Sequence, residues 1–137
     1  MLQAIDLDIR PGEVVGIEGD AGLVDRARRN AERNRISNAA FFSADLYGEL
    51  QSEPWMDDRF DKALLDPPRS GALQVLPLLP GLGVQRIVYV SCEPTTLARD
   101  GALLIEGGYH LLEVQPLDMF PQTFHVETVS LWQRADG

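Results

Sequence analysis

The side chains best suited to chemistry lie just after short apolar runs of the sequence. Three acids and the only thiol occupy such places: Glu18, Asp45, Asp66 and Cys92. In open α/β sheets, ligands bind outside the carboxyl ends of the strands. If the apolar runs are strands, these four side chains lie where a ligand would bind.

Cys92 stands within Ser91-Cys92-Glu93-Pro94, between an apolar run and a predicted helix. Unpaired backbone N–H groups and the dipole at a helix N-terminus favour a thiolate, so a nucleophile could form here. An inert, buried cysteine is an equally weighted alternative. Glu93 argues mildly against activation, because a neighbouring carboxylate raises the pKa of a thiol.

The three acids suit a nucleoside ligand. A carboxylate at the position of Glu18 typically accepts hydrogen bonds from ribose hydroxyls, and Asp45 could reach an adenine amino group. Both could instead be ordinary loop acids that cap helices. Asp66-Pro67-Pro68-Arg69 predicts a stiff turn that holds a carboxylate in place, or simply the end of a strand followed by a surface arginine.

His125 and Glu127 are candidates for a general base. They open the last predicted strand, and alternation would place them on the same face. The competing interpretation is that both are solvated charges at the start of a strand.

The composition limits the class of protein. With 137 residues and 45% hydrophobic content, the chain is long enough for one domain with a core. The net charge of −9 has the wrong sign for gripping nucleic acid phosphates unaided. There is no long apolar run and no basic signal peptide, so we expect a cytoplasmic protein that binds neither a membrane nor a metal.

Apolar runs alternate with amphipathic stretches, which predicts an α/β fold with a mostly parallel sheet. The predicted strands are Val14–Glu18, Asn38–Ser43, Lys62–Leu65, Arg86–Val90, Tyr109–Gln115 and Glu127–Gln133. One helix follows the N-cap Asp20 and ends near Asn34, and another covers Thr95–Glu106 before Gly107 and Gly108. Gln51–Arg59 and Pro116–His125 are predicted loops, the latter a candidate functional loop, and prolines limit any helix within Leu73–Leu79 to a turn or two.

From about Val14 to Arg134 the chain resembles the bacterial RNA uracil-5 methyltransferases, most closely those acting on 23S ribosomal RNA. The resemblance rests on the order and spacing of Val15-Gly16-Ile17-Glu18-Gly19, Ala27-Arg28-Arg29-Asn30-Ala31, Leu65-Asp66-Pro67-Pro68-Arg69, Tyr89-Val90-Ser91-Cys92-Glu93-Pro94, Thr95-Thr96-Leu97-Ala98-Arg99-Asp100, and Asp118-Met119-Phe120-Pro121-Gln122-Thr123 with His125-Val126-Glu127. The resemblance implies a Rossmann-like methyltransferase fold and a reaction that uses S-adenosyl-L-methionine as the methyl donor.

The resemblance also implies a mechanism and a substrate. Cys92 would add to carbon 6 of a uracil, and Glu127 would remove the proton from carbon 5 after methylation. Asp66 would bridge cofactor and base, with Glu18 and Asp45 on the cofactor and Pro67 and Arg69 on the substrate. The target uridine must be single-stranded or turned out of a helix.

The chain departs from the family pattern in two places. Glu93 replaces the usual Asn of Ser-Cys-Asn-Pro, and Met1–Glu13 contains no Gly-rich loop for the methionine end of the cofactor. Leu2–Ile9 could only pair antiparallel, through a Pro11-Gly12 turn, because Arg10–Glu13 is too short for a parallel crossover. We therefore expect an atypical segment 1–13, a partial, N-terminally truncated catalytic domain 14–137, weak cofactor binding by this chain alone, and RNA binding mainly through parts outside it.

Two other functions remain open at this point. An exocyclic amino-group methyltransferase would use Asp-Pro-Pro without a cysteine, although Arg69 stands where those enzymes have an aromatic residue. A truncated, non-catalytic domain with a methyltransferase-like fold would agree with the acidic charge.

Overall fold

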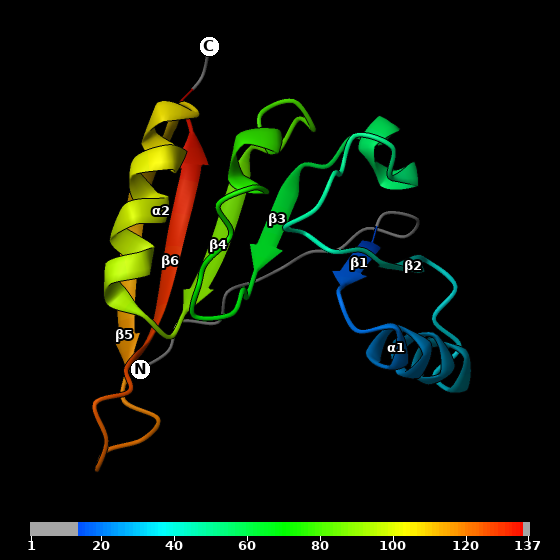
Figure 1. Ribbon diagram of the computed structural model, residues 1–137, viewed down its shortest axis with the longest axis horizontal. Coiled ribbons are helices and arrows are strands. Elements are labelled where there is room, and N and C mark those ends of the chain that lie inside the picture. The colour runs from blue at the N-terminus through cyan, green and yellow to red at the C-terminus, as the bar shows by residue number, and fades with distance from the viewer. Residues whose placement is uncertain (1–13, 136–137) are drawn as a thin grey trace. The chain divides into compact units, whose positions relative to one another are not determined.

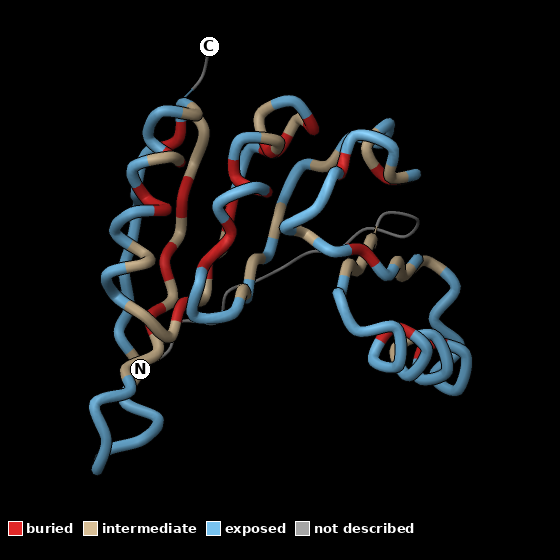
Figure 2. The backbone as a smooth tube through the Cα atoms, viewed as in Figure 1, coloured by how far each residue is buried: buried red, intermediate tan, exposed pale blue. Residues whose placement is uncertain are grey.

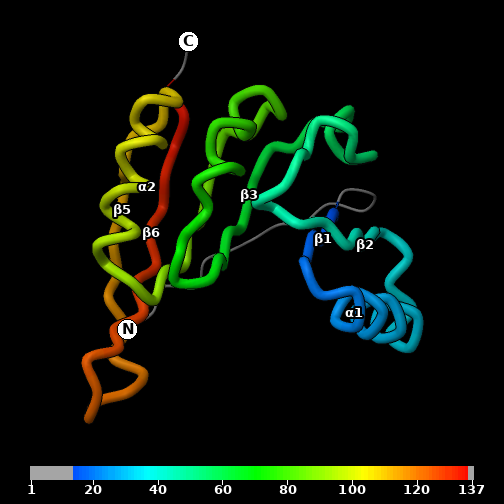
Figure 3. Tube along the Cα trace, viewed as in Figure 1, coloured from blue at the N-terminus to red at the C-terminus, as the bar shows by residue number. Residues whose placement is uncertain are grey.

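The computed structural model describes residues 14–135. The chain divides into two compact units, residues 1–55 and 56–137, and each is described by itself. The predicted hairpin strand Leu2–Ile9 and its turn at Pro11-Gly12 lie outside the described residues. Figure 1 gives the element labels, and Figure 3 follows the course of the chain.

The first unit contains a parallel strand pair joined by a helix. Strand β1 (Val14–Glu18) pairs with β2 (Ala39–Ser43), and helix α1 (Ala21–Arg33) connects them. Asp20 caps α1 as predicted, since its Oδ1 accepts a hydrogen bond from the Leu23 N–H at 3.0 Å. Such a cap stabilises a helix by about 1 kcal/mol. Gly16 is needed in β1 because an added Cβ would come within 2.6 Å of the Phe41 ring on β2.

The second unit is built on a four-stranded sheet in the order β3-β4-β6-β5. Its strands are β3 (Lys62–Leu65), β4 (Arg86–Ser91), β5 (Tyr109–Leu117) and β6 (Glu127–Arg134). Strands β3 and β4 are parallel, whereas β6 is antiparallel to both β4 and β5. Three strands therefore run in one direction and β6 runs against them, so the predicted mostly parallel sheet is confirmed with one reversed strand.

Residues 66–85 connect β3 to β4 and contribute much of the core. Their buried apolar residues are Ala72, Val75, Leu76, Leu79, Leu82 and Val84. The short helix predicted within Leu73–Leu79 is a 3-10 turn, η2 (Leu76–Leu78). Pro77 and Pro80 account for its length, because a proline lacks the N–H that would extend a helix.

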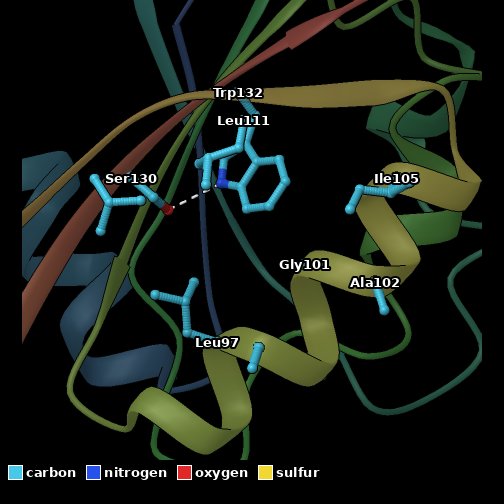
Figure 4. Close-up of a pocket in the computed structure, with 9 residues that line it drawn as sticks. Leu97, Gly101, Ala102, Ile105, Leu111, Ser130 and Trp132 are labelled. Atoms are coloured by element: carbon cyan, nitrogen blue, oxygen red, sulfur yellow. Dashed lines mark hydrogen bonds between the residues drawn. The ribbon is translucent and has the colours of Figure 1, made fainter.

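Helix α2 (Pro94–Glu106) packs on the sheet through its apolar face. Figure 2 shows buried positions along β4, β6 and one side of α2. Gly101 allows the close approach, since an added Cβ would lie 3.0 Å from the Trp132 ring. In Figure 4, Trp132 stands between α2 and the sheet and donates a hydrogen bond from Nε1 to Ser130 Oγ at 2.9 Å. The helix ends at Gly107, and Gly108 takes the left-handed conformation with φ +87°.

The structure differs from the prediction in two segments that were expected to be loops throughout. Within Gln51–Arg59 the chain forms a 3-10 turn, η1 (Pro54–Asp57), because Trp55 is buried and anchors it. Strand β5 extends to Leu117, so the exposed connection before β6 covers residues 118–126 rather than starting at Pro116. Pro116 is tolerated because β5 lies at the sheet edge. Among the described residues, no helix has the length and apolar character needed to cross a membrane.

Candidate active site

Three of the predicted catalytic residues lie at one end of the second unit's sheet. Strand β3 pairs with β4 up to Leu65 and Tyr89, and Asp66 is the next residue. Strand β4 pairs with β6 up to Ser91 and Thr128, so Cys92 follows the last pair on one strand and Glu127 precedes it on the other. Because β6 runs antiparallel to β4, its first residue lies at the same end of the sheet as the carboxyl ends of β3 and β4.

Cys92 occupies a bend held by its two neighbours. The buried Ser91 Oγ donates to the Glu93 carbonyl at 3.0 Å and accepts from the Glu93 N–H at 3.1 Å. These bonds connect the end of β4 to the start of α2 across Cys92. The Cys92 thiol is free and half-buried, which differs from the alternative of a cysteine enclosed in the core.

Glu93 acts as the N-cap of α2, a role that the sequence did not reveal. Its Oε1 accepts hydrogen bonds from the Thr95 hydroxyl at 2.8 Å and the Thr95 N–H at 3.4 Å, while Oε2 pairs with Arg69 Nη2 at 3.0 Å. The Thr95 hydroxyl and then Arg69 lower the pKa of Glu93 below its usual value of 4.5. The negative charge of Glu93, which was expected to oppose a thiolate at Cys92, is therefore balanced by Arg69 and by the N-terminus of α2.

The turn after Asp66 is held by backbone contacts. The Gly71 N–H donates to the Pro68 carbonyl at 2.8 Å, and the Thr96 hydroxyl donates to the Arg69 carbonyl at 2.9 Å. Asp66 is exposed, Pro67 is half-buried, and the Arg69 side chain remains 66% exposed despite its ion pair. These contacts fix the path of the chain that carries the predicted carboxylate.

Glu127 and His125 have different surroundings. Glu127 is half-buried as the first residue of β6, where it pairs with Leu117 of β5. His125 is exposed and precedes the strand, and its N–H donates to the Thr123 hydroxyl at 3.3 Å. Strand β6 begins only at Glu127, so His125 lies outside the strand and the alternation argument does not apply to it.

Glu18 and Asp45 belong to the first unit and share one end of its strand pair. Glu18 is the last residue of β1 and pairs with Ser43, and Asp45 follows that pair by two residues. Each carboxylate is exposed and also supports a local turn: Glu18 Oε1 accepts from the Asp20 N–H at 3.0 Å, and Asp45 Oδ1 accepts from the Tyr47 N–H at 3.0 Å. Neither carboxylate caps a helix, because the N-cap of α1 is Asp20 and a turn rather than a helix follows Asp45.

Two residues near the site were missed in the sequence. Asp100 of α2 is fully buried, and Tyr89 of β4 donates its hydroxyl to the Asp100 carboxylate at 2.5 Å. The spacing of Leu97, Asp100, Gly101 and Leu104 already indicated that Asp100 lies on the apolar helix face. Within residues 14–135 there is no cluster of three His, Cys, Asp or Glu side chains that could hold a metal ion.

Solved structures with a similar fold have low sequence identity to this chain, and several of them are named as methyltransferases. NSun6 from Pyrococcus horikoshii matches 92% of this chain and 42% of its own with a TM-score of 0.65 and 15% identity. Magnesium protoporphyrin IX methyltransferase from Synechocystis PCC 6803, solved with bound SAM, matches 89% of this chain and 59% of its own with a TM-score of 0.63 and 15% identity. They confirm the predicted methyltransferase fold.

Closer relatives are found by sequence. The chain is 57% identical over 123 residues to the 23S rRNA (uracil(1939)-C(5))-methyltransferase RlmD of Xanthomonas axonopodis pv. citri (strain 306), covering 89% of this chain. It is 56% identical over 126 residues to the same-named protein of Stenotrophomonas maltophilia (strain K279a), covering 91%. The chain spans only 28% of the length of each of these curated relatives. Residues 14–135 match the family tRNA (Uracil-5-)-methyltransferase, and the chain belongs to that family.

Proposed function

We propose that the protein carrying this chain methylates carbon 5 of a uridine in 23S ribosomal RNA, with Cys92 as a covalent nucleophile. The observation that supports this is the pairing of β4 with β6, which sets Cys92 and Glu127 next to the same last strand pair. Asp66 follows the neighbouring strand at the same end. Close relatives named as 23S rRNA uracil-5 methyltransferases support the substrate class.

The chemistry starts at carbon 6 of the base. The Cys92 thiolate forms a bond to carbon 6, and the electrons of the carbon 5–carbon 6 double bond move toward oxygen 4, which makes carbon 5 nucleophilic. S-Adenosyl-L-methionine, when bound, supplies a methyl group on a positively charged sulfur. Once carbon 5 is methylated, the Glu127 carboxylate takes its proton, the double bond returns, and the carbon 6–sulfur bond breaks to release Cys92.

The exposed carboxylates suit the cofactor that this reaction needs. Glu18 and Asp45 lie at the carboxyl ends of two parallel strands, the place where open α/β sheets bind nucleotides. Their free oxygens are acceptors, and adenosine presents ribose hydroxyl and adenine amino donors. Asp66 would hold both the cofactor and the base.

The substrate side of the site would be formed by the turn after Asp66. Pro67 gives a stiff apolar surface, and the exposed Arg69 guanidinium has donors beyond the one that contacts Glu93. These groups suit a planar base with its attached phosphate. A target base must leave its stack to reach Cys92, so we infer an unpaired or flipped uridine.

The product of the reaction tests this function. The protein expressed from its complete gene is incubated with S-adenosyl-L-methionine and 23S rRNA lacking the modification, and the digested RNA is analysed by mass spectrometry. We expect one 5-methyluridine per rRNA with the wild type and none with Cys92→Ala. Methylation of an exocyclic amine that survives Cys92→Ala indicates an amino-group methyltransferase, and no methylation by the wild type indicates a non-catalytic domain.

A further inference from the structure

Asp100 has a buried carboxylate that takes no part in the reaction steps proposed above. It lies on α2 with an exposed fraction of 0%, next to Gly101 and Leu104 on the face that packs against the sheet. An ionised carboxylate in such a place requires several hydrogen-bond donors. The origin of these donors indicates what Asp100 holds together.

One oxygen of Asp100 is shared by the two segments that carry Asp66 and Cys92. Oδ2 accepts the Ala72 N–H at 2.8 Å, and Ala72 lies six residues after Asp66 in the connection that follows β3. The same Oδ2 accepts the Tyr89 hydroxyl at 2.5 Å, and Tyr89 lies on β4 just before Cys92. A single atom thus anchors both segments.

Neighbouring residues of α2 strengthen the hold on residues 66–72, which we call the Asp66 loop. Arg99 binds Asp100 Oδ1 through Nε at 2.9 Å and Nη2 at 2.6 Å, and its Nη2 also donates to the Ser70 carbonyl at 2.7 Å. Gly71 has φ +83°, and a Cβ there would overlap the Asp100 carboxylate. The loop therefore approaches the helix as closely as glycine allows.

We propose that Asp100 is a positioning residue for the methyl transfer, because it fixes the Asp66 loop relative to the strand that leads to Cys92. This role rests on the proposed function. In an enzyme that aligns a base between a nucleophile and a methyl donor, a displacement of about 1 Å can reduce the rate by about a hundredfold. Loosening the shared anchor should therefore slow the reaction even when the protein stays folded.

Two tyrosine variants separate this role from general stability. Tyr89→Phe removes the hydroxyl that reaches Asp100. Tyr109→Phe is the matched control, because Tyr109 is also buried and its hydroxyl donates one hydrogen bond, to the Val84 carbonyl at 2.8 Å. Tyr109 starts β5 at the end of the sheet away from Cys92, since it pairs with Arg134. Asp100→Asn is a second variant, which turns one of the two acceptor oxygens into a donor.

The measurements are the turnover rate at saturating RNA and S-adenosyl-L-methionine, well below the melting temperature, and the hydrogen exchange of the peptide containing Ala72. We expect Tyr89→Phe to lower kcat about tenfold or more and to speed the exchange at Ala72, with a larger effect of Asp100→Asn. Tyr109→Phe should stay within about twofold of the wild type in both.

Equal kcat values for Tyr89→Phe and Tyr109→Phe would overturn the positioning role. Unchanged exchange at Ala72 in both Tyr89→Phe and Asp100→Asn would overturn the anchor itself, whatever the rates. A wild type that does not methylate RNA would reject the proposed function, and with it the role in catalysis, while the exchange result would still report whether the anchor exists.

Discussion

At the scale of single residues, the strand-end rule found most of the candidate site but not its connections. Asp66 and Cys92 follow β3 and β4, as the apolar runs indicated. The position of Glu127 beside Cys92 could not be read from the sequence, because it depends on β6 running antiparallel to β4. The role of Glu93 as a helix cap was hidden because glutamate is not among the side chains that usually cap a helix N-terminus, and its ion pair with Arg69 depends on a different segment of the chain.

Replacement of Glu127 by Gln tests the assignment of the base. The neutral amide cannot accept the proton from carbon 5, so release of Cys92 should stall after methyl transfer. We expect turnover to fall by about a hundredfold to ten-thousandfold and a covalent enzyme–RNA complex to accumulate on unmodified RNA, visible as a shifted band on a denaturing gel.

Glu113→Gln is the matched control for this experiment, because Glu113 is an exposed glutamate on the neighbouring strand β5. It should turn over like the wild type and leave no shifted band. Equal turnover of the Glu127 and Glu113 variants would show that another group removes the proton.

At the scale of elements, short runs rich in branched and aromatic apolar residues predicted the strands well, because such residues favour extended backbone in a sheet. The bounds of β1 and β3 agree with the prediction, and β2, β4 and β6 differ by one residue at an end. The connections were less predictable. The turn η1 depends on the burial of Trp55, and the extension of β5 past Gln115 depends on its pairing with the first residues of β6.

The cap of α2 gives the protein a pH-dependent contribution to stability. The pKa of Glu93 is lowered in the folded state, so its ionised form stabilises the fold at pH values above its usual 4.5, and this contribution is lost as the pH falls through the lower folded value. Urea unfolding at several pH values should show that Glu93→Gln is less stable than the wild type near pH 7 and that the difference shrinks below about pH 4.

Glu106→Gln serves as the comparison for the cap. Glu106 is exposed at the last position of the same helix, where a negative charge opposes the dipole, so this change should cause no loss of stability. A difference between Glu93→Gln and wild type that stays constant with pH would contradict the assigned role of the Glu93 charge.

At the scale of the whole molecule, the sequence indicated the α/β fold class because apolar runs typical of strands alternate with amphipathic stretches typical of helices. The structure adds a division into two units, with Glu18 and Asp45 in the first and Asp66, Cys92 and Glu127 in the second. The net charge of −9 bears on RNA binding, because an acidic chain repels the phosphates of RNA. It supports the proposal that most of the RNA affinity lies outside these 137 residues.

Cofactor affinity is the property of the isolated chain most open to measurement. Residues 1–13 contain a single glycine, Gly12, and no Gly-rich loop to hold the methionine end of the cofactor. We therefore expect the 137-residue chain to bind S-adenosyl-L-methionine with a dissociation constant of about 1 mM or weaker in calorimetric titration. A micromolar constant would contradict this expectation and indicate that Glu18, Asp45 and Asp66 suffice.

The most direct test of the account is to trap the bond between Cys92 and the RNA. With 5-fluorouridine at the target position, carbon 5 carries no proton for Glu127 to remove, so the adduct should persist after methylation. The protein from its complete gene is incubated with this RNA and S-adenosyl-L-methionine, and the mixture is digested with nuclease and protease. Mass spectrometry should then find the methylated nucleotide attached to the peptide that contains Cys92. An adduct on another residue, or full methylation of ordinary 23S rRNA by Cys92→Ala, would contradict the central claim.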